Sequence, residues 1–139
     1  MNEYRFCDLS IGMEESFCRE ITEEMMAQFL AITNDINPLH KHIEYALEKG
    51  FKGKVVYGML TASLISTLGG VYLPGKYCLI HGVEIKFLNP VYIGDNITVT
   101  GKVVELHESV EQMTVKVMMK NQCGQVVCRG KLKAGVLHE

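Results

Sequence analysis

The stretch "TNDINPLHKH", residues 33–42, brings together side chains that can move protons. Aspartate and histidine side chains ordinarily have pKa values of about 3.9 and 6.5, so this pair of residue types can offer a carboxylate and a neutral imidazole near pH 7. Pro38 fixes its own φ and favours an extended backbone at Asn37. Such rigidity suits acid–base catalysis, because a catalytic base must lie within hydrogen-bond reach of its proton. The alternative interpretation is a turn stabilised by an Asx side chain, with a histidine at the surface.

Helical spacing of apolar residues surrounds this stretch. Residues 21–33 predict an amphipathic helix that Thr22 begins, and Asn34 follows its last turn, where a left-handed conformation is common. A short helix is predicted at residues 43–48 and a longer, largely apolar one at residues 58–68, ending at Gly69 and Gly70. The proton-transfer residues therefore lie between helices.

The second half of the chain changes to alternating, β-branched patterns typical of strands. Four strands are predicted at residues 77–89, 96–106, 111–121 and 126–137, and residues 16–20 could add a strand at an edge. One apolar face of this sheet must be covered, and residues 58–68 are the only element apolar enough to cover it. We expect an α+β fold in which a curved antiparallel sheet wraps around a central helix.

Composition narrows the classes of function. A length of 139 residues suits one domain, 1–139, and the formal charge of -2 with no basic run argues against a nucleic-acid partner. No charged residue lies between Lys54 and Lys76, but glycines, a proline and hydroxyl side chains dilute that segment, which favours a buried helix over a membrane span. The N-terminus lacks the apolar region of a signal peptide, and five cysteines are an odd number, so we expect reduced thiols and a cytoplasmic location.

Three segments together resemble a known family. The runs "NDINPLHKHIEYA", "VVYGMLTASLIS" and "IKFLNPVYIGDNITVTGKV" are similar to the MaoC-like dehydratases, of the (R)-specific enoyl-CoA hydratase type, from about Met26 onward. The resemblance implies a hot-dog fold and a homodimer or higher homo-oligomer. It also implies a 2-enoyl thioester of CoA or of an acyl carrier protein as substrate, and neither a metal nor a redox cofactor.

The resemblance also implies roles for particular residues. Asp35 and His40 match the catalytic acid–base pair. We expect Asp35 to take a proton from the attacking water and His40 to supply one to Cα, although a shared water lets either group act as the base. Asn37 matches the amide that arranges the pair, and Ser66 the helix serine near the acid. Gly58 matches the glycine whose N–H binds the thioester carbonyl; independently, a free N–H at a helix start suits a developing enolate oxygen.

The chain departs from the family pattern at some positions. Asn34 replaces a glycine that tolerates the same geometry, and Tyr57 replaces a histidine, which puts the range of substrates in doubt. His42 replaces an aspartate that would cap the next helix; with His40 it could form half of a metal site, but two histidines alone predict no metal. Lys49, Lys52 and Lys54 form a basic loop that is either solvated or a contact for CoA phosphates.

Two other functions remain open from the sequence. A hot-dog thioesterase would hydrolyse the same thioester and release free thiol. A non-catalytic module would only bind the acyl thioester, although a binder has no need of a matched acid and base.

Overall fold

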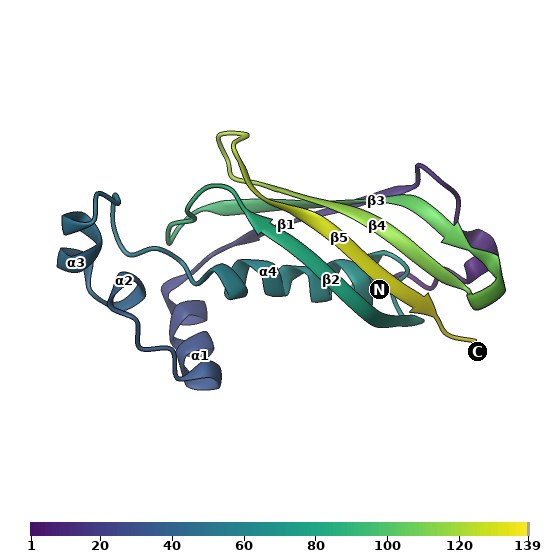
Figure 1. The fold of residues 1–139 in the computed structure, drawn as a ribbon, viewed down its shortest axis with the longest axis horizontal. Helices are drawn as coiled ribbons and strands as arrows, with labels where there is room; N and C mark the ends of the chain where they lie inside the picture. The colour runs from purple at the N-terminus through teal and green to yellow at the C-terminus, as the bar shows by residue number, and fades with distance from the viewer. Residues whose placement is uncertain (139) are drawn as a thin grey trace.

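The computed structural model describes residues 1–138, which build a five-stranded antiparallel sheet (Figure 1). The strands lie in the order β1-β3-β4-β5-β2. Their bounds are β1 Glu14–Glu20, β2 Cys78–Phe87, β3 Asn96–His107, β4 Gln112–Lys120 and β5 Val126–Val136. All five predicted strands are confirmed, including the N-terminal strand at an edge.

Helix α4, Gly58–Thr67, lies along the concave face of this sheet (Figure 1). Ile65 and Leu68 are almost fully buried and belong to the same core cluster as Val99, Val115 and Val117 of the sheet. The apolar helix is thus a core helix, and none of the helices within residues 1–138 is long and apolar enough to cross a membrane. A curved sheet wrapped around one helix is the hot-dog fold, as the sequence predicted.

The central helix does not end where the sequence suggested. Instead of stopping at Gly69 and Gly70, it continues through them as a π-helical turn, η2, Leu68–Tyr72. A Cβ at Gly69 would lie 3.0 Å from the Sγ of Cys78 and 3.3 Å from a methyl of Leu132. The glycine therefore serves close packing of helix against sheet, a use that local sequence cannot distinguish from helix termination.

Three helices lie together beyond one end of the sheet, on the side where α4 begins (Figure 1). They are α1 Glu23–Thr33, α2 Pro38–Lys41 and α3 Ile43–Glu48. The Thr22 hydroxyl accepts a hydrogen bond from the Met25 N–H and so caps α1, and Asn34 ends it in the left-handed conformation at φ 55° and ψ 29°. Both predicted ends of α1 are confirmed. Two single 3₁₀ turns, η1 Phe6–Asp8 and η3 Glu108–Val110, complete the helical elements of residues 1–138.

Candidate active site

The turn between α1 and α2 is held by hydrogen bonds from its own side chains. The Thr33 hydroxyl accepts from the Asp35 N–H at 3.2 Å, and the Asp35 carboxylate accepts from the Asn37 N–H at 3.1 Å. The Asn37 side-chain oxygen then accepts from the Leu39 N–H at 2.9 Å and caps α2, which begins at Pro38. Each short polar side chain thus satisfies a backbone donor, which makes the turn rigid.

His40 is fixed by two contacts at the end of this turn. Its Nδ1 lies 2.6 Å from the carbonyl oxygen of Val55, and its ring centre lies 4.3 Å from that of Tyr57. A carbonyl only accepts hydrogen bonds, so Nδ1 must carry a hydrogen in this contact. Nε2 is therefore the nitrogen that is left for proton transfer.

Tyr57 joins the two halves of the motif. Its side chain is only 3% exposed, and its hydroxyl donates a hydrogen bond to the backbone carbonyl of Asp35 at 2.8 Å. Burial raises the pKa of this phenol, the Asp35 carboxylate raises it further and Lys54 opposes the shift, so the hydroxyl keeps its proton near neutral pH. The sequence marked Tyr57 only as a departure from the family; its contacts make it a positioning residue.

A pocket of about 290 Å³ opens beside His40. Gly58, Thr61, Phe87 and Leu88 also line it, so α2, the start of α4 and the end of β2 meet there. A Cβ at Gly58 would lie 3.2 Å from the Phe87 ring, so the glycine keeps this space open. Gly58 is the first residue of α4, where backbone N–H groups have no partner within the helix and the helix dipole favours negative charge.

Thr61 is a polar pocket residue that sequence reasoning missed. It is 1% exposed, and its hydroxyl oxygen has no hydrogen-bond partner within the described residues. Leaving such a group unbonded in the interior is costly, so an unbonded hydroxyl at a pocket wall is available to a bound molecule. The only signal in the sequence was a hydroxyl residue three positions, about one helical turn, after Gly58.

The structure brings together only part of the predicted site. His40 and Gly58 line the pocket, whereas Asp35 and Asn37 are exposed beside it and do not line it. Ser66 is also exposed, and lies eight residues along α4 from Gly58, a distance of about 12 Å. The roles of Asp35, Asn37 and Ser66 remain predictions.

The basic loop lies next to the pocket. Lys52 and Lys54 line a second depression of about 960 Å³, and Pro90 lines both hollows. Lys54 forms an ion pair with Glu23 at 2.7 Å, whereas Lys52 is exposed. The predicted contact with CoA phosphates remains a prediction.

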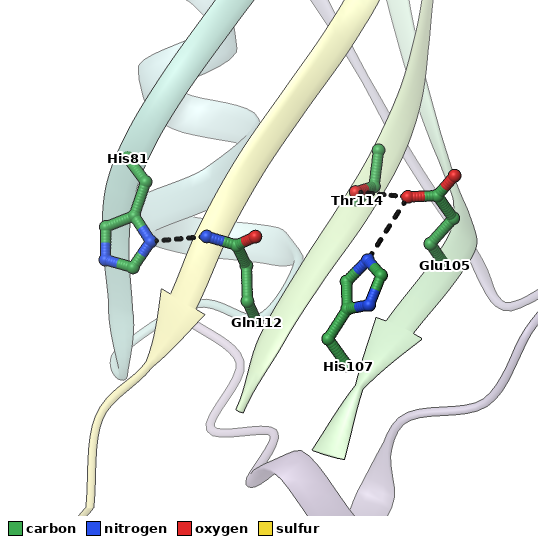
Figure 2. Close-up of polar contacts among 5 residues, drawn as sticks. All are labelled: His81, Glu105, His107, Gln112 and Thr114. Carbon is green, nitrogen blue, oxygen red and sulfur yellow. Dashed lines mark hydrogen bonds and ion pairs between the residues drawn. The ribbon is translucent and has the colours of Figure 1, made fainter. Parts of the chain in front are cut away.

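None of the other described histidines lines the pocket. Figure 2 shows His81, which accepts from the Gln112 amide at 2.8 Å, and His107, whose Nε2 lies 3.3 Å from the Glu105 carboxylate. His42 is exposed at the start of α3 and its side chain makes no capping hydrogen bond. His81 of β2 and His107 of β3 thus lie on the sheet, away from the turn that carries Asp35.

Comparisons with known proteins show the family of the chain. Residues 10–124 match the family model described as MaoC like domain. The chain is 32% identical over 123 residues to an (R)-specific enoyl-CoA hydratase of Aeromonas caviae, covering 88% of this chain and 92% of that protein. It is 30% identical over 112 residues to a mitochondrial 3-hydroxyacyl-(acyl-carrier-protein) dehydratase of Arabidopsis thaliana, covering 81% of this chain and 66% of that protein.

A solved structure is similar over nearly the whole chain. The unliganded R-hydratase PhaJ1 from Pseudomonas aeruginosa superimposes with a TM-score of 0.90 at 28% identity, covering 97% of this chain and 86% of that one. The shared fold, the matched family model and the identity over most of the chain show that this protein belongs to the MaoC-like domain family.

Proposed function

We propose that this protein is a hydro-lyase that adds water across the double bond of a trans-2-enoyl thioester to give the (R)-3-hydroxyacyl thioester, and catalyses the reverse dehydration. The names of its relatives, hydratases and dehydratases, support this class of reaction. The observation that carries the proposal is the pocket in which a fixed imidazole at His40 faces the amino end of α4 at Gly58. A proton-transfer group and an oxyanion donor at one cavity are two of the groups that this hydration needs.

The proposed chemistry requires Asp35 and His40 to hold one proton between them. Hydration starts from an Asp35 carboxylate and a His40 imidazolium, which carries hydrogens on both Nδ1 and Nε2. As the water oxygen attacks Cβ, Asp35 takes one proton from the water and His40 gives its Nε2 proton to Cα, which leaves a protonated Asp35 and a neutral imidazole. The proton then returns from Asp35 to Nε2 before the next turnover. The two groups exchange roles in the dehydration. The Val55 carbonyl supports this assignment, because it keeps Nδ1 occupied and leaves Nε2 as the working nitrogen.

The amino end of α4 would stabilise the intermediate. Negative charge develops on the thioester oxygen as water adds, and the unpaired N–H at Gly58 is a suitable donor for it. The Thr61 hydroxyl, one helical turn further, is buried at the same pocket without a partner, so we assign it a contact with the substrate or with the attacking water.

A second copy of the chain would complete the site. Strand β2 forms an edge of the sheet, and its side chains Leu79, Val83 and Phe87 are 49%, 47% and 50% exposed. An apolar edge strand with unpaired backbone groups is suited to pair with the same strand of another copy. We therefore propose a homodimer through β2.

The outer face of α4 supports the same dimer. Met59, Ser63 and Ser66 are exposed, and their spacing puts them on one side of the helix, facing away from the core. If two α4 helices ran antiparallel across the interface, Ser66 of the second copy would approach the turn that carries Asp35. This arrangement would account for a predicted site serine that lies far from Gly58 in its own chain.

A charged substitution on β2 tests the proposed dimer. Val83→Asp should give a monomer in sedimentation and lower the activity, because a desolvated carboxylate opposes pairing at β2. Val110→Asp is the matched control, since Val110 is 66% exposed on η3. A Val83→Asp monomer with full activity would contradict the proposed shared site.

The substrate is proposed to be an enoyl thioester of CoA or of an acyl carrier protein, handled by a single domain in the cytoplasm without metal or redox cofactor. A pure sample given a short trans-2-enoyl-CoA should lose the alkene absorbance, release no free thiol and form the (R)-3-hydroxy product. Thiol release would indicate a thioesterase. Binding without turnover for several chain lengths on both carriers would indicate the non-catalytic module.

A further inference from the structure

The convex face of the sheet, which turns away from α4, gathers positive charge. Half of the chain's 14 Lys and Arg residues lie on strands β2 to β5 with exposed side chains on this face. Their alternation with buried residues such as Val115 and Val117 places them opposite the core. This basic face consists of Lys86, Lys102, Lys116, Lys120, Arg129, Lys131 and Lys133.

The register places like charges directly beside one another. Lys116 of β4 is paired with Lys102 of β3 on one side and with Lys131 of β5 on the other, and Arg129 is paired with Lys86 of β2. Side chains at paired positions lie about 5 Å apart at Cβ, and like charges there destabilise a sheet. Lys131 has an acidic neighbour on its other side, because it is paired with Glu84 of β2, whereas Lys116 lies between two cations. The like charges around Lys116 and Arg129 do not stabilise the sheet, which points to an external partner.

Few acidic groups neutralise the face. Among residues 1–138, Lys102 pairs with Glu14 at 3.9 Å, whereas Lys86, Lys116 and Lys131 form no ion pair within 4 Å. The Glu105 carboxylate is engaged by the Thr114 hydroxyl at 3.1 Å and by His107 (Figure 2). Glu84 and Glu105 thus offset part of the charge near Lys131, whereas Lys86 and Lys116 remain available to a partner.

The basic face adjoins the pocket that His40 lines. Lys86 and Arg129 are each one residue from a pocket wall, Phe87 and Cys128 respectively. Adjacent residues of a strand are separated by about 3.3 Å along it and point to opposite faces. A molecule seated on the basic face would thus lie behind the pocket wall, and Asn89, which also lines the pocket, marks a route around the end of β2.

The chemistry of the face favours a protein as the partner. A second copy would bring lysine against lysine, and the formal charge of -2 gives no general attraction to nucleic acids or anionic membranes. A localised basic patch instead suits a localised acidic patch, which steers association and fixes orientation. Within the proposed function, the partner that must approach this end of the pocket is the carrier of the acyl group.

We infer that the basic face docks an acyl carrier protein through an acidic surface on that protein, so that its thioester arm enters the pocket around the end of β2. This inference rests on the proposed function, and it assigns the carrier-bound thioester as a substrate. The free CoA thioester lacks a protein surface, so its turnover should not depend on this face.

Charge reversal on the face tests the inference. The double variant Lys86→Glu/Lys116→Glu places a carboxylate beside a cation at each position. The new Glu at position 86 faces Arg129, and the one at position 116 lies between Lys102 and Lys131, so Tm should stay equal or rise. With the same enoyl group on both carriers, kcat/KM for the acyl-carrier-protein thioester should fall at least tenfold, mainly through KM, and for the CoA thioester change less than twofold. Added salt should weaken the wild-type preference for the carrier.

Arg19→Glu/Lys76→Glu is the matched control, because it makes the same change of net charge at exposed positions off the face. It should leave both substrates unaffected. An equal loss in the control, an equal loss for the CoA thioester, or an unchanged carrier rate in the face variant would overturn the inference.

A direct measurement of carrier-protein binding tests the docking independently of the proposed reaction. Fluorescently labelled acyl carrier protein should bind the wild type saturably and with salt sensitivity, and should lose affinity at least tenfold with the face variant. Hydration of the CoA thioester without carrier binding would overturn the docking alone. Carrier binding without turnover of either thioester would overturn the proposed reaction and leave the docking supported.

Discussion

The central helical segment differs between its two ends. At the carboxyl end, Leu68 is fully buried and Gly69 allows the chain to pack tightly against Cys78 and Leu132. At the amino end, Gly58 opens onto a pocket and Met59 is 63% exposed. The carboxyl end is completed by its own chain, whereas the amino end still offers surface and hydrogen-bonding groups.

This difference separates residues that maintain the fold from residues that we expect to act on a substrate. Apolar groups at the closed end are satisfied by packing, so their removal costs stability. The Thr61 hydroxyl at the open end finds no partner within residues 1–138, so its removal should cost activity instead. Substitutions at the two ends should therefore affect different measurements.

The largest effect on stability is expected at the closed end. Leu68→Ala should lower the free energy of unfolding by about 2–5 kcal/mol, because it leaves a cavity between helix and sheet. Urea denaturation measures this loss, and Ile32→Ala is the control, since Ile32 is 81% exposed on α1. The folded Leu68→Ala protein should keep nearly wild-type activity; a stable but inactive variant would show that the two ends are not separable.

A smaller effect is expected in the turn that leads to the open end. Asn34 has φ 55°, which a β-branched residue tolerates poorly, so Asn34→Val should destabilise the protein by about 1 kcal/mol or more. Asn34→Gly should be nearly neutral, because glycine adopts this conformation freely. Equal Tm values for the two variants would argue against strain at this position.

The smallest effect on stability is expected at Thr61. Thr61→Val removes a buried hydroxyl that has no partner, so the free energy of unfolding should stay the same or rise by up to about 1 kcal/mol. Activity should nevertheless fall by about tenfold, the value of one ordinary hydrogen bond. Thr61→Ser keeps the hydroxyl and is the control. A Thr61→Val variant that is less stable yet fully active would show that the hydroxyl forms a hydrogen bond within the protein and not with the substrate.

The sequence predicted the helices and strands better than the contacts between them. Thr22, Asn34 and the alternating strands act locally, through hydrogen bonds and backbone preferences that the neighbouring residues determine, so α1 and the strands were found correctly. The continuation of the helix through Gly69 depends on Cys78 and Leu132, which pack against it from strands that are distant in the sequence. Local patterns cannot reveal such contacts.

The same distinction holds in the site. The hydrogen bonds from Thr33 to Leu39 are local, and the predicted stiff turn is present. By contrast, the roles of Val55 and Tyr57 became apparent only when the chain brought them against His40 and the carbonyl of Asp35. The basic face likewise required the register of β3, β4 and β5, because its lysines are spread over separate strands.

The central claim is that Asp35 and His40 act as one proton-transfer pair. Asp35→Asn and His40→Gln keep the approximate shape of each side chain but remove one proton-transfer group, which typically contributes about 10²- to 10⁴-fold in rate. With a trans-2-enoyl-CoA substrate, each variant should fold normally and lose activity of that order, and the double variant should be hardly worse than either single one, because the pair acts as a unit. Turnover near the wild-type rate in either single variant would contradict the claim and place the catalyst elsewhere in the protein.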